Sequence, residues 1–241
     1  MSRLKKRPPK TPDGVRIYAI GDVHGRADLL AQLFAGIDDD IAAYPAQRVI
    51  EILLGDYIDR GPQSREVLDI LVARSHQREM VCLKGNHETY LPDFLRDPAT
   101  LGQWRCYGGI ETLLSYGVMP SINPDKQEQR GLAAAFNRAL PESHRRFLAN
   151  LRSSFACGDY FFVHAGVRPG VPLSHQHEQD LLCIREDFLL HAESFGKMVV
   201  HGHTAVAEPD MRPNRINIDT GAYATGKLTC LVLEGEDMTF I

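Results

Sequence analysis

The sequence predicts an α/β protein built on a parallel sheet, and three observations support this fold class. Short apolar runs alternate with segments of helical periodicity between residues 15 and 85, which is the pattern of βαβ units. Several of these runs end in a glycine or histidine turn that bears polar side chains. The chain has 241 residues and is 44% hydrophobic, values typical of one globular domain with a sizeable core.

The first half of the chain alternates between predicted strands and predicted helices. Residues 15–20, 48–54 and 79–85 are short and mostly apolar, and each ends at or just before a glycine, so each predicts a buried strand. Residues 26–44 and 64–74 place apolar side chains at helical spacing, so each predicts a helix.

The second half begins with a change of pattern. Residues 90–155 mix short helical stretches with Gly and Pro breaks, and residues 141–151 predict a helix with Pro141 in its first turn. Strand-like runs follow at residues 160–166, 197–204, 215–222 and 227–235. We expect a flexible basic tail over 1–12 and a single domain over 13–241, with a helical cap-like insertion at about 90–155.

Composition limits the partners and the compartment. The formal net charge is −4 although the first 12 residues hold five basic side chains, so the rest of the chain is acidic and does not suit nucleic-acid binding. No apolar run is long enough to span a membrane, and the five scattered cysteines are expected to be reduced thiols. We therefore expect a cytoplasmic protein without a nucleic-acid or membrane partner. The sequence carries no signal for an oligomeric state.

Five turns carry the chemistry, and each follows a predicted strand. They are GDVHG (21–25), GDYIDRG (55–61), GNHE (85–88), HAG (164–166) and HGHT (201–204). Open α/β sheets bind ligands at the carboxyl ends of their strands, so the five turns are predicted to meet in one crevice.

The turns contain a set of potential metal ligands without a thiolate. These ligands are Asp22, His24, Asp56, Asn86, His164 and His203. Oxygen and imidazole ligands suit Mn, Fe or Zn better than Ca, and a carboxylate shared between two ions suits a binuclear site.

These motifs, together with IDTGA at 218–222, resemble those of the phosphoprotein phosphatase branch of the calcineurin-like metallophosphoesterases. The sequence is most similar in character to bacterial and lambda-phage protein phosphatases and to symmetrical diadenosine tetraphosphatases. The resemblance runs from residue 21 to about 222 and is weakest in 90–155. It implies a central β-sandwich of two mixed sheets, flanked by helices, around two divalent metal ions.

The resemblance also implies a role for each matched residue. Asp22 and His24 would hold the first metal, Asp56 would bridge both, and Asn86, His164 and His203 would hold the second. His87 would be the proton donor and Asp59 its orienting carboxylate. Arg60 and Arg185 would bind phosphate, although Cys183 stands where such bacterial enzymes often have Trp two residues before the second arginine. His201 is expected near the site, without an assigned role.

The implied function is that of a metal-dependent phosphomonoesterase, and the preferred expectation is a serine/threonine protein phosphatase. A hydroxide that bridges two divalent ions would attack the phosphoryl group in line. Mn is the metal expected first, with Fe or Zn as alternatives. The substrate would be a phosphorylated protein or a small phosphoester.

Two alternatives stay open at this point. One is a dinucleoside polyphosphate hydrolase such as a diadenosine tetraphosphatase. For that enzyme, Trp104, Tyr107 and Tyr116 could clamp a base, or they could simply pack in a core. The other is a non-catalytic binding protein on the same fold, which the complete ligand set disfavours.

Overall fold

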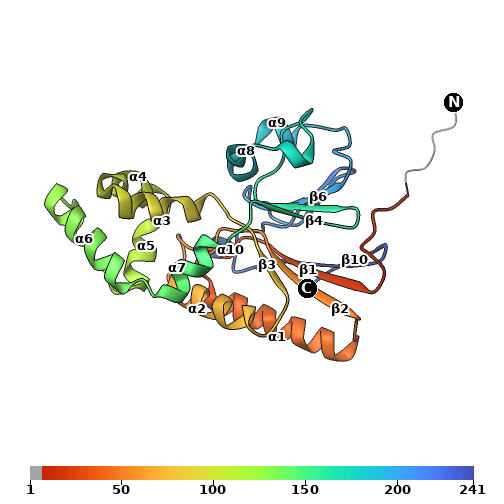
Figure 1. Cartoon of the computed structure of the whole chain (residues 1–241), viewed down its shortest axis with the longest axis horizontal. Helices are drawn as coiled ribbons and strands as arrows, with labels where there is room; N and C mark the ends of the chain where they lie inside the picture. The colour runs from red at the N-terminus through yellow and green to blue at the C-terminus, as the bar shows by residue number, and fades with distance from the viewer. Residues whose placement is uncertain (1–6) are drawn as a thin grey trace.

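The computed structural model describes residues 7–241 and folds them into two five-stranded sheets that pack face to face (Figure 1). The first sheet has the order β10-β9-β1-β2-β3 and the second has the order β4-β5-β6-β8-β7. The first comprises β1 (Val15–Ile20), β2 (Arg48–Leu53), β3 (Met80–Cys82), β9 (Cys230–Glu234) and β10 (Asp237–Phe240). The second comprises β4 (Ser154–Cys157), β5 (Tyr160–Val163), β6 (Met198–His201), β7 (Asp210–Met211) and β8 (Arg215–Asn217).

Each sheet combines three parallel strands with two strands that pair antiparallel. In the first sheet β1, β2 and β3 run parallel, whereas β9 and β10 pair antiparallel. In the second, β5, β6 and β8 run parallel, whereas β4 and β7 pair antiparallel. The predicted class, an α/β sandwich of two mixed sheets flanked by helices, is therefore confirmed.

Strand β1 shows how the pleat divides the core. Ile17 and Ala19 are fully buried between the two sheets, where Phe162 of β5 meets them. Tyr18 and Ile20 alternate with them and are buried against the helices on the outer face. A strand buried on both faces is mostly apolar, and the one charged side chain of VRIYAI, Arg16, is paired with Asp40 and Glu234.

Helices cover the outer face of each sheet (Figure 1). Helices α1 (Ala27–Ala43) and α2 (Ser64–Ser75) cover the first sheet. Helices α8 (Glu178–Cys183) and α9 (Glu186–Leu189) cover the second, where Phe188 packs against Val199 of β6.

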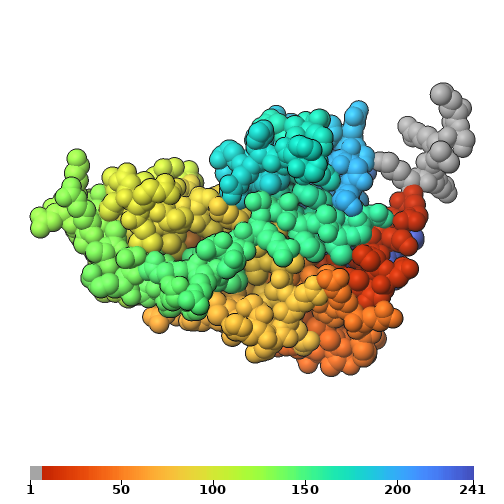
Figure 2. Space-filling view, in the orientation of Figure 1, coloured from red at the N-terminus to blue at the C-terminus, as the bar shows by residue number. Residues whose placement is uncertain are grey.

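The segment expected to be a helical insertion is helical from α3 to α7. It contains α3 (His87–Arg96), α4 (Leu101–Trp104), α5 (Gly109–Ser115), α6 (Lys126–Ala139) and α7 (Glu142–Ala149), with short 3-10 turns at Pro98–Thr100 and Arg105–Tyr107. Phe94, Trp104 and Phe136 are fully buried and form its aromatic centre. In the space-filling view these yellow and green residues project beyond one end of the sandwich (Figure 2).

The domain begins before residue 13. Thr11 is fully buried, its amide donates to Gly235 O at 3.0 Å, and its hydroxyl accepts from Gly235 N at 2.8 Å. The expected boundary at residue 12 therefore falls later than the first contacts with the domain, and residues 1–6 of the expected tail lie outside the described part. Within residues 7–241, no helix is both long and apolar enough to cross a membrane.

Candidate active site

The turns that follow the parallel strands of both sheets come together, as the sequence predicted. His24 N donates to Asp56 O at 2.8 Å, which joins the turns after β1 and β2. His87 N donates to Asp56 Oδ1 at 3.1 Å, which joins the turn after β3. His203 N donates to Asp22 Oδ2 at 3.0 Å, which links the second sheet to the first.

Asp56 lies at the centre of two groups of potential metal ligands. His24, Asp56 and His87 present ligand atoms within 4.8 Å of one another, and so do Asp56, His164 and His203. Asp56 Oδ2 is 3.3 Å from His24 Nε2, whereas Asp56 Oδ1 is 3.5 Å from His164 Nε2. Each oxygen of one carboxylate therefore faces a different group, which is the arrangement that a bridging ligand needs.

The predicted ligands Asn86 and Asp22 adjoin these groups. Asn86 Oδ1 is 3.0 Å and His203 Nδ1 is 3.2 Å from His164 Nε2. Asp22 Oδ1 and His203 Nε2 are buried without a hydrogen-bond partner among the described residues. Buried polar atoms are nearly always paired, so these two orphaned atoms fit a site that takes a cation.

The histidines have the tautomer that leaves one nitrogen facing the carboxylates. His24 Nδ1 donates to Ile58 O at 2.9 Å, and His164 Nδ1 donates to Leu54 O at 3.0 Å. These bonds fix the rings and leave each Nε2 directed at Asp56. Burial lowers the pKa of His24 to about 3, so the ring is neutral at physiological pH, as a metal ligand must be.

Uncompensated negative charge supports the same conclusion. Burial, and then the charges of Asp219 and Asp56, raise the pKa of Asp22 well above its usual value. Burial and the nearby carboxylate of Asp56 raise the pKa of Glu88 to about 7. Buried acids of one sign repel one another, and bound divalent cations would remove that cost. The donor set therefore fits divalent metal ions.

Backbone strain is concentrated in the same place. Among residues 7–241, the non-glycine residues with positive φ are His24 (43°), Asp56 (51°), Asp59 (71°), Arg60 (66°) and His203 (65°). All five belong to the predicted site. The left-handed region costs such residues roughly 1–3 kcal/mol each, and this cost persists where the surrounding structure aims a side chain for function.

The proposed proton donor and its carboxylate are in contact. His87 Nδ1 is 2.8 Å from Asp59 Oδ2, and both side chains are buried. His87 Nε2 faces the cluster, 3.8 Å from Asp56 Oδ2 and 3.4 Å from Arg60 Nη2. His87 lies close enough to His24 and Asp56 to serve as a metal ligand. The hydrogen bond to Asp59 favours the role of proton donor instead.

Asp59 is held by two side chains that the sequence did not link to it. Trp104 Nε1 donates to Asp59 Oδ2 at 2.9 Å, and Thr112 Oγ1 donates to Asp59 Oδ1 at 2.6 Å. Trp104 and Tyr116 are buried, so of the three aromatic residues expected for a base clamp only Tyr107 is exposed. Trp104 thus packs in a core, as the alternative expectation had it, and also binds Asp59.

Glu88 also supports the site, although the sequence analysis assigned it no role. Its carboxylate accepts hydrogen bonds from the amides of Asp56 (2.9 Å), Tyr57 (2.8 Å) and Gly85 (2.8 Å). It therefore fixes the turn that carries the shared carboxylate. The GNHE motif contained the signal, because Glu88 lies in the first turn of α3 directly beside the predicted site.

The two arginines predicted to bind phosphate have different surroundings. Arg60 contacts His87, and its guanidinium lies 4.7 Å above the ring of Tyr223. Arg185 is exposed just before α9 and lines a hollow of about 290 Å³ with Cys183.

His201 does not face the cluster through any contact of the described residues. It is buried at the end of β6, its Nδ1 is 3.1 Å from Gly202 O, and its ring lies edge-on against Phe188 at 4.9 Å. Its contacts are thus with α9 on the outer face of the second sheet.

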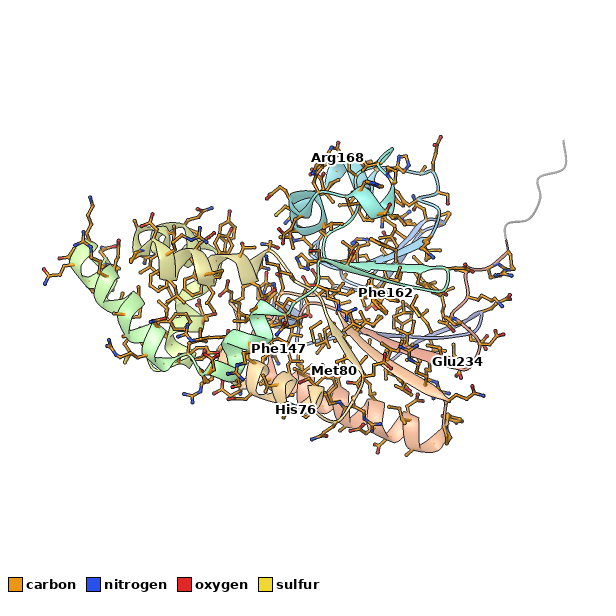
Figure 3. All side chains as sticks on the ribbon, viewed as in Figure 1. His76, Met80, Phe147, Phe162, Arg168 and Glu234 are labelled. Atoms are coloured by element: carbon orange, nitrogen blue, oxygen red, sulfur yellow. The ribbon has the colours of Figure 1, made fainter. Side chains whose placement is uncertain are left out.

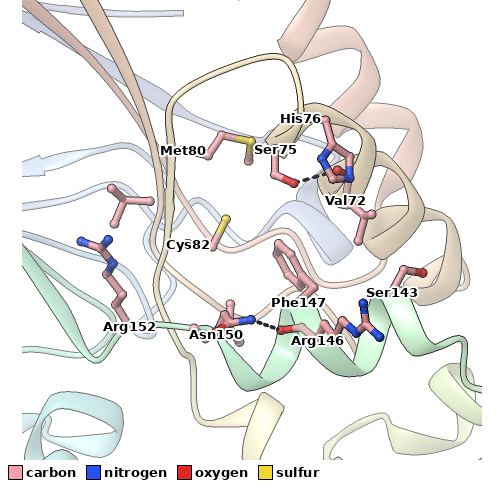
Figure 4. Close-up of a pocket in the computed structure, with 12 residues that line it drawn as sticks. Val72, Ser75, His76, Met80, Cys82, Ser143, Arg146, Phe147, Asn150 and Arg152 are labelled. Carbon is pink, nitrogen blue, oxygen red and sulfur yellow. Dashed lines mark hydrogen bonds between the residues drawn. The ribbon is translucent and has the colours of Figure 1, made fainter.

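A second cavity lies outside the cluster around Asp56. It has a volume of about 460 Å³ and lies between α2, β3 and α7. His76, Met80 and Phe147 are neighbours there (Figure 3), and Arg152 lies at its rim (Figure 4). None of the predicted site residues lines it, so the candidate active site is the cluster around Asp56.

A buried cluster of carboxylates and imidazoles at the shared edge of an α/β sandwich, beside a His–Asp pair, defines a metal-dependent hydrolase. The chain belongs to the calcineurin-like phosphoesterase family, whose model matches residues 15–216. It is therefore a phosphoric ester hydrolase, and the family uses divalent metal ions.

Curated relatives are named as enzymes that cleave phosphoanhydride bonds. An asymmetrical bis(5'-nucleosyl)-tetraphosphatase PrpE of Anoxybacillus flavithermus is 25% identical over 231 residues, covering 88% of each chain. A zinc-dependent endopolyphosphatase of Saccharomyces cerevisiae is 37% identical over 186 residues, covering 70% of this chain and 52% of the yeast protein.

Solved structures share the fold. One, described provisionally as a diadenosine tetraphosphatase, has a TM-score of 0.64 at 17% identity and covers 98% of both chains. A cold-active protein-tyrosine phosphatase of a Shewanella species has a TM-score of 0.59 at 16% identity, covering 96% of this chain and 80% of that one.

Proposed function

We propose that the protein hydrolyses nucleoside polyphosphates at a two-metal site centred on Asp56. The observation that carries the two-metal proposal is the shared carboxylate, because its two oxygens face separate groups of ligands. Asp22 and His24 would hold one ion, and Asn86, His164 and His203 would hold the other. When bound, the ions supply Lewis-acid activation of water and of the phosphoryl group.

The chain's own residues would do the rest. Arg60 and Arg185 would hold the phosphoryl oxygens, since a guanidinium can make two parallel hydrogen bonds to them. His87 would give the proton on Nε2 to the leaving oxygen, because Nδ1 is already bonded to Asp59. Asp59 would hold the ring in that orientation and stabilise its doubly protonated form.

The choice of substrate rests on the relatives of matching length. Those that cover 88% of the chain are named bis(5'-nucleosyl)-tetraphosphatases, which favours the nucleotide alternative of the sequence analysis. A phosphoserine or phosphothreonine protein is the second candidate, favoured by the GDYIDRG and GNHE motifs. We propose Mn as the first metal to test, with Zn and Fe beside it, since the yeast relative is named zinc-dependent.

A substrate panel tests this proposal. Metal-free protein is reloaded with Mn²⁺, Zn²⁺ or Fe²⁺ and assayed on p-nitrophenyl phosphate, diadenosine tetraphosphate, and phosphoserine, phosphothreonine and phosphotyrosine peptides. We expect metal-dependent hydrolysis, with the highest kcat/KM for diadenosine tetraphosphate. Preference for phosphoserine or phosphothreonine peptides would overturn the substrate proposal. No hydrolysis with any metal would overturn the catalytic proposal.

A further inference from the structure

Two stacked tyrosines lie beside the proposed proton donor. The rings of Tyr90 (α3) and Tyr107 lie 5.1 Å apart with an interplanar angle of 18°. Each also meets the His87 ring edge-on, at centroid distances of 6.0 Å and 6.2 Å. Tyr107 is 42% exposed although Tyr90 covers part of it, so the stack has aromatic surface available to a ligand.

The backbone fixes this stack relative to Arg60. Gly108, which follows Tyr107, has φ +94° and accepts a hydrogen bond from Arg60 N at 3.2 Å. A Cβ at Gly108 would lie 2.3 Å from that same nitrogen, so the close approach requires glycine. The turn that carries Tyr107 is thus attached to the turn that carries the proposed phosphate ligand.

The chemistry of the reaction indicates which part of the substrate would lie beside the two tyrosines. In an in-line displacement, the attacking water oxygen forms the new P–O bond while the P–O bond to the leaving group breaks on the opposite side. The leaving oxygen then takes the proton from His87 Nε2. The leaving group must therefore extend past His87, where Tyr90 and Tyr107 are.

These rings suit a leaving group that carries a flat aromatic ring, which in a nucleotide is the base beyond the phosphates and the ribose. Tyrosine rings stack on nucleobases without regard to base identity, because every base has a π-face. Burial, together with the neighbouring Tyr107, raises the pKa of Tyr90 to about 12, so its hydroxyl stays neutral beside a phosphate.

We propose that Tyr90 and Tyr107 form a leaving-group subsite that stacks on the base of a nucleotide. This proposal rests on the proposed function and specifies its substrate recognition. A phosphotyrosine side chain offers the same aromatic chemistry, so the test must separate the two sources.

The test compares Tyr107→Leu with Tyr107→Phe in the Mn²⁺-loaded protein. Tyr44→Leu serves as the control, since Tyr44 is 65% exposed at the end of α1, away from the site. The substrates are diadenosine tetraphosphate, a phosphotyrosine peptide and inorganic tripolyphosphate, whose leaving group has no ring. Calorimetric binding of AMP gives a readout that is independent of turnover.

We expect Tyr107→Leu to weaken AMP binding, and to lower kcat/KM for diadenosine tetraphosphate, by roughly 5- to 100-fold, the usual range for loss of one base–aromatic stack. Tyr107→Phe and Tyr44→Leu should stay near wild type, and tripolyphosphate hydrolysis by Tyr107→Leu should change less than about twofold.

Three results would overturn the proposal. These are an unchanged AMP affinity in Tyr107→Leu, an equal loss on tripolyphosphate, and a loss confined to the phosphotyrosine peptide. If wild-type protein hydrolyses nothing but binds AMP through Tyr107, the proposed function fails while the stacking subsite stands.

Discussion

His87 Nδ1 lies 2.8 Å from Asp59 Oδ2, and the other side-chain partners of that carboxylate come from the helical insertion. Trp104 and Thr112, 45 and 53 residues away in the sequence, bind Asp59 from α4 and α5. The insertion therefore reaches into the site and holds the pair that we propose to deliver the proton.

Replacing His87 with Asn should separate proton donation from metal binding. We expect His87→Asn to keep its metal content and to lose about 10²- to 10⁴-fold in kcat on phenyl phosphate, whose leaving group needs the proton. The loss on p-nitrophenyl phosphate should be much smaller. Elemental analysis beside both assays provides the check, and a loss of metal would show that His87 is a ligand.

Two aspartates in the same turn should behave differently. Asp56→Asn removes a charge from the shared carboxylate, so we expect lower metal content per chain by elemental analysis. Asp59→Asn should keep its metal and lose turnover, because the Asp59 carboxylate contacts His87, the proposed proton donor, rather than one of the six proposed metal ligands. Equal metal content in the two variants would contradict a bridging role for Asp56.

Thr112→Val should weaken the orientation of His87 without affecting the metal site. The hydroxyl donates to Asp59 Oδ1 and accepts from Asp59 N at 2.9 Å, so Val removes both bonds at nearly constant volume. We expect kcat on phenyl phosphate to fall roughly 10-fold, the scale of one hydrogen bond to a charged group, with KM unchanged. Thr112→Ser should restore it, and Thr100→Val, in an exposed turn, serves as the control. A matching loss on p-nitrophenyl phosphate would indicate a structural effect.

Glu88→Gln should destabilise the protein. The Glu88 carboxylate accepts from three backbone amides, whereas the NH₂ group of glutamine would face one of those donors. We expect a loss of about 1–3 kcal/mol in the free energy of unfolding, measured with denaturant in the Mn²⁺-loaded protein, where bound cations would offset the repulsion between Glu88 and Asp56. Glu142→Gln, at an exposed ion pair with Arg146, should change it little. Equal stability of the two variants would argue against this role of Glu88.

His144 should make stability depend on pH. It is buried, its Nδ1 is 2.7 Å from Tyr116 Oη, and its Nε2 is 3.0 Å from Asp69 Oδ1. Burial lowers the pKa of His144, against the opposing effect of Asp69, so below the ordinary histidine pKa of about 6.5 the unfolded chain binds more protons than the folded one.

The free energy of unfolding should therefore fall as the pH drops below about 6.5, with His144 contributing at most about 1.4 kcal/mol per pH unit. His144→Gln should flatten the curve between about pH 6.5 and 5, as measured by denaturant unfolding of the metal-free protein. Parallel curves for the variant and the wild type would refute the assignment.

Local sequence signals predicted the central strands and the helices α1, α2 and α7. The short edge strands β4, β7 and β10 were not predicted, because strands of four or fewer partly exposed residues show no clear periodicity. Helix α6 was not predicted although Asp125 caps it by accepting from Glu128 N at 2.8 Å, because Gly and Pro residues interrupt the helical pattern of 90–155.

The sequence by itself determined the order and chemical type of the candidate site residues. Metal ligands that follow consecutive strands are local features, and parallel strands bring their ends to one edge, so the motifs alone placed the cluster. Only the tertiary structure decided how those residues connect. That Asp56 faces two ligand groups, that Glu88 supports its turn, and that Trp104 and Thr112 hold Asp59 all depend on contacts between separate segments. Such contacts are set by packing, which no local pattern encodes.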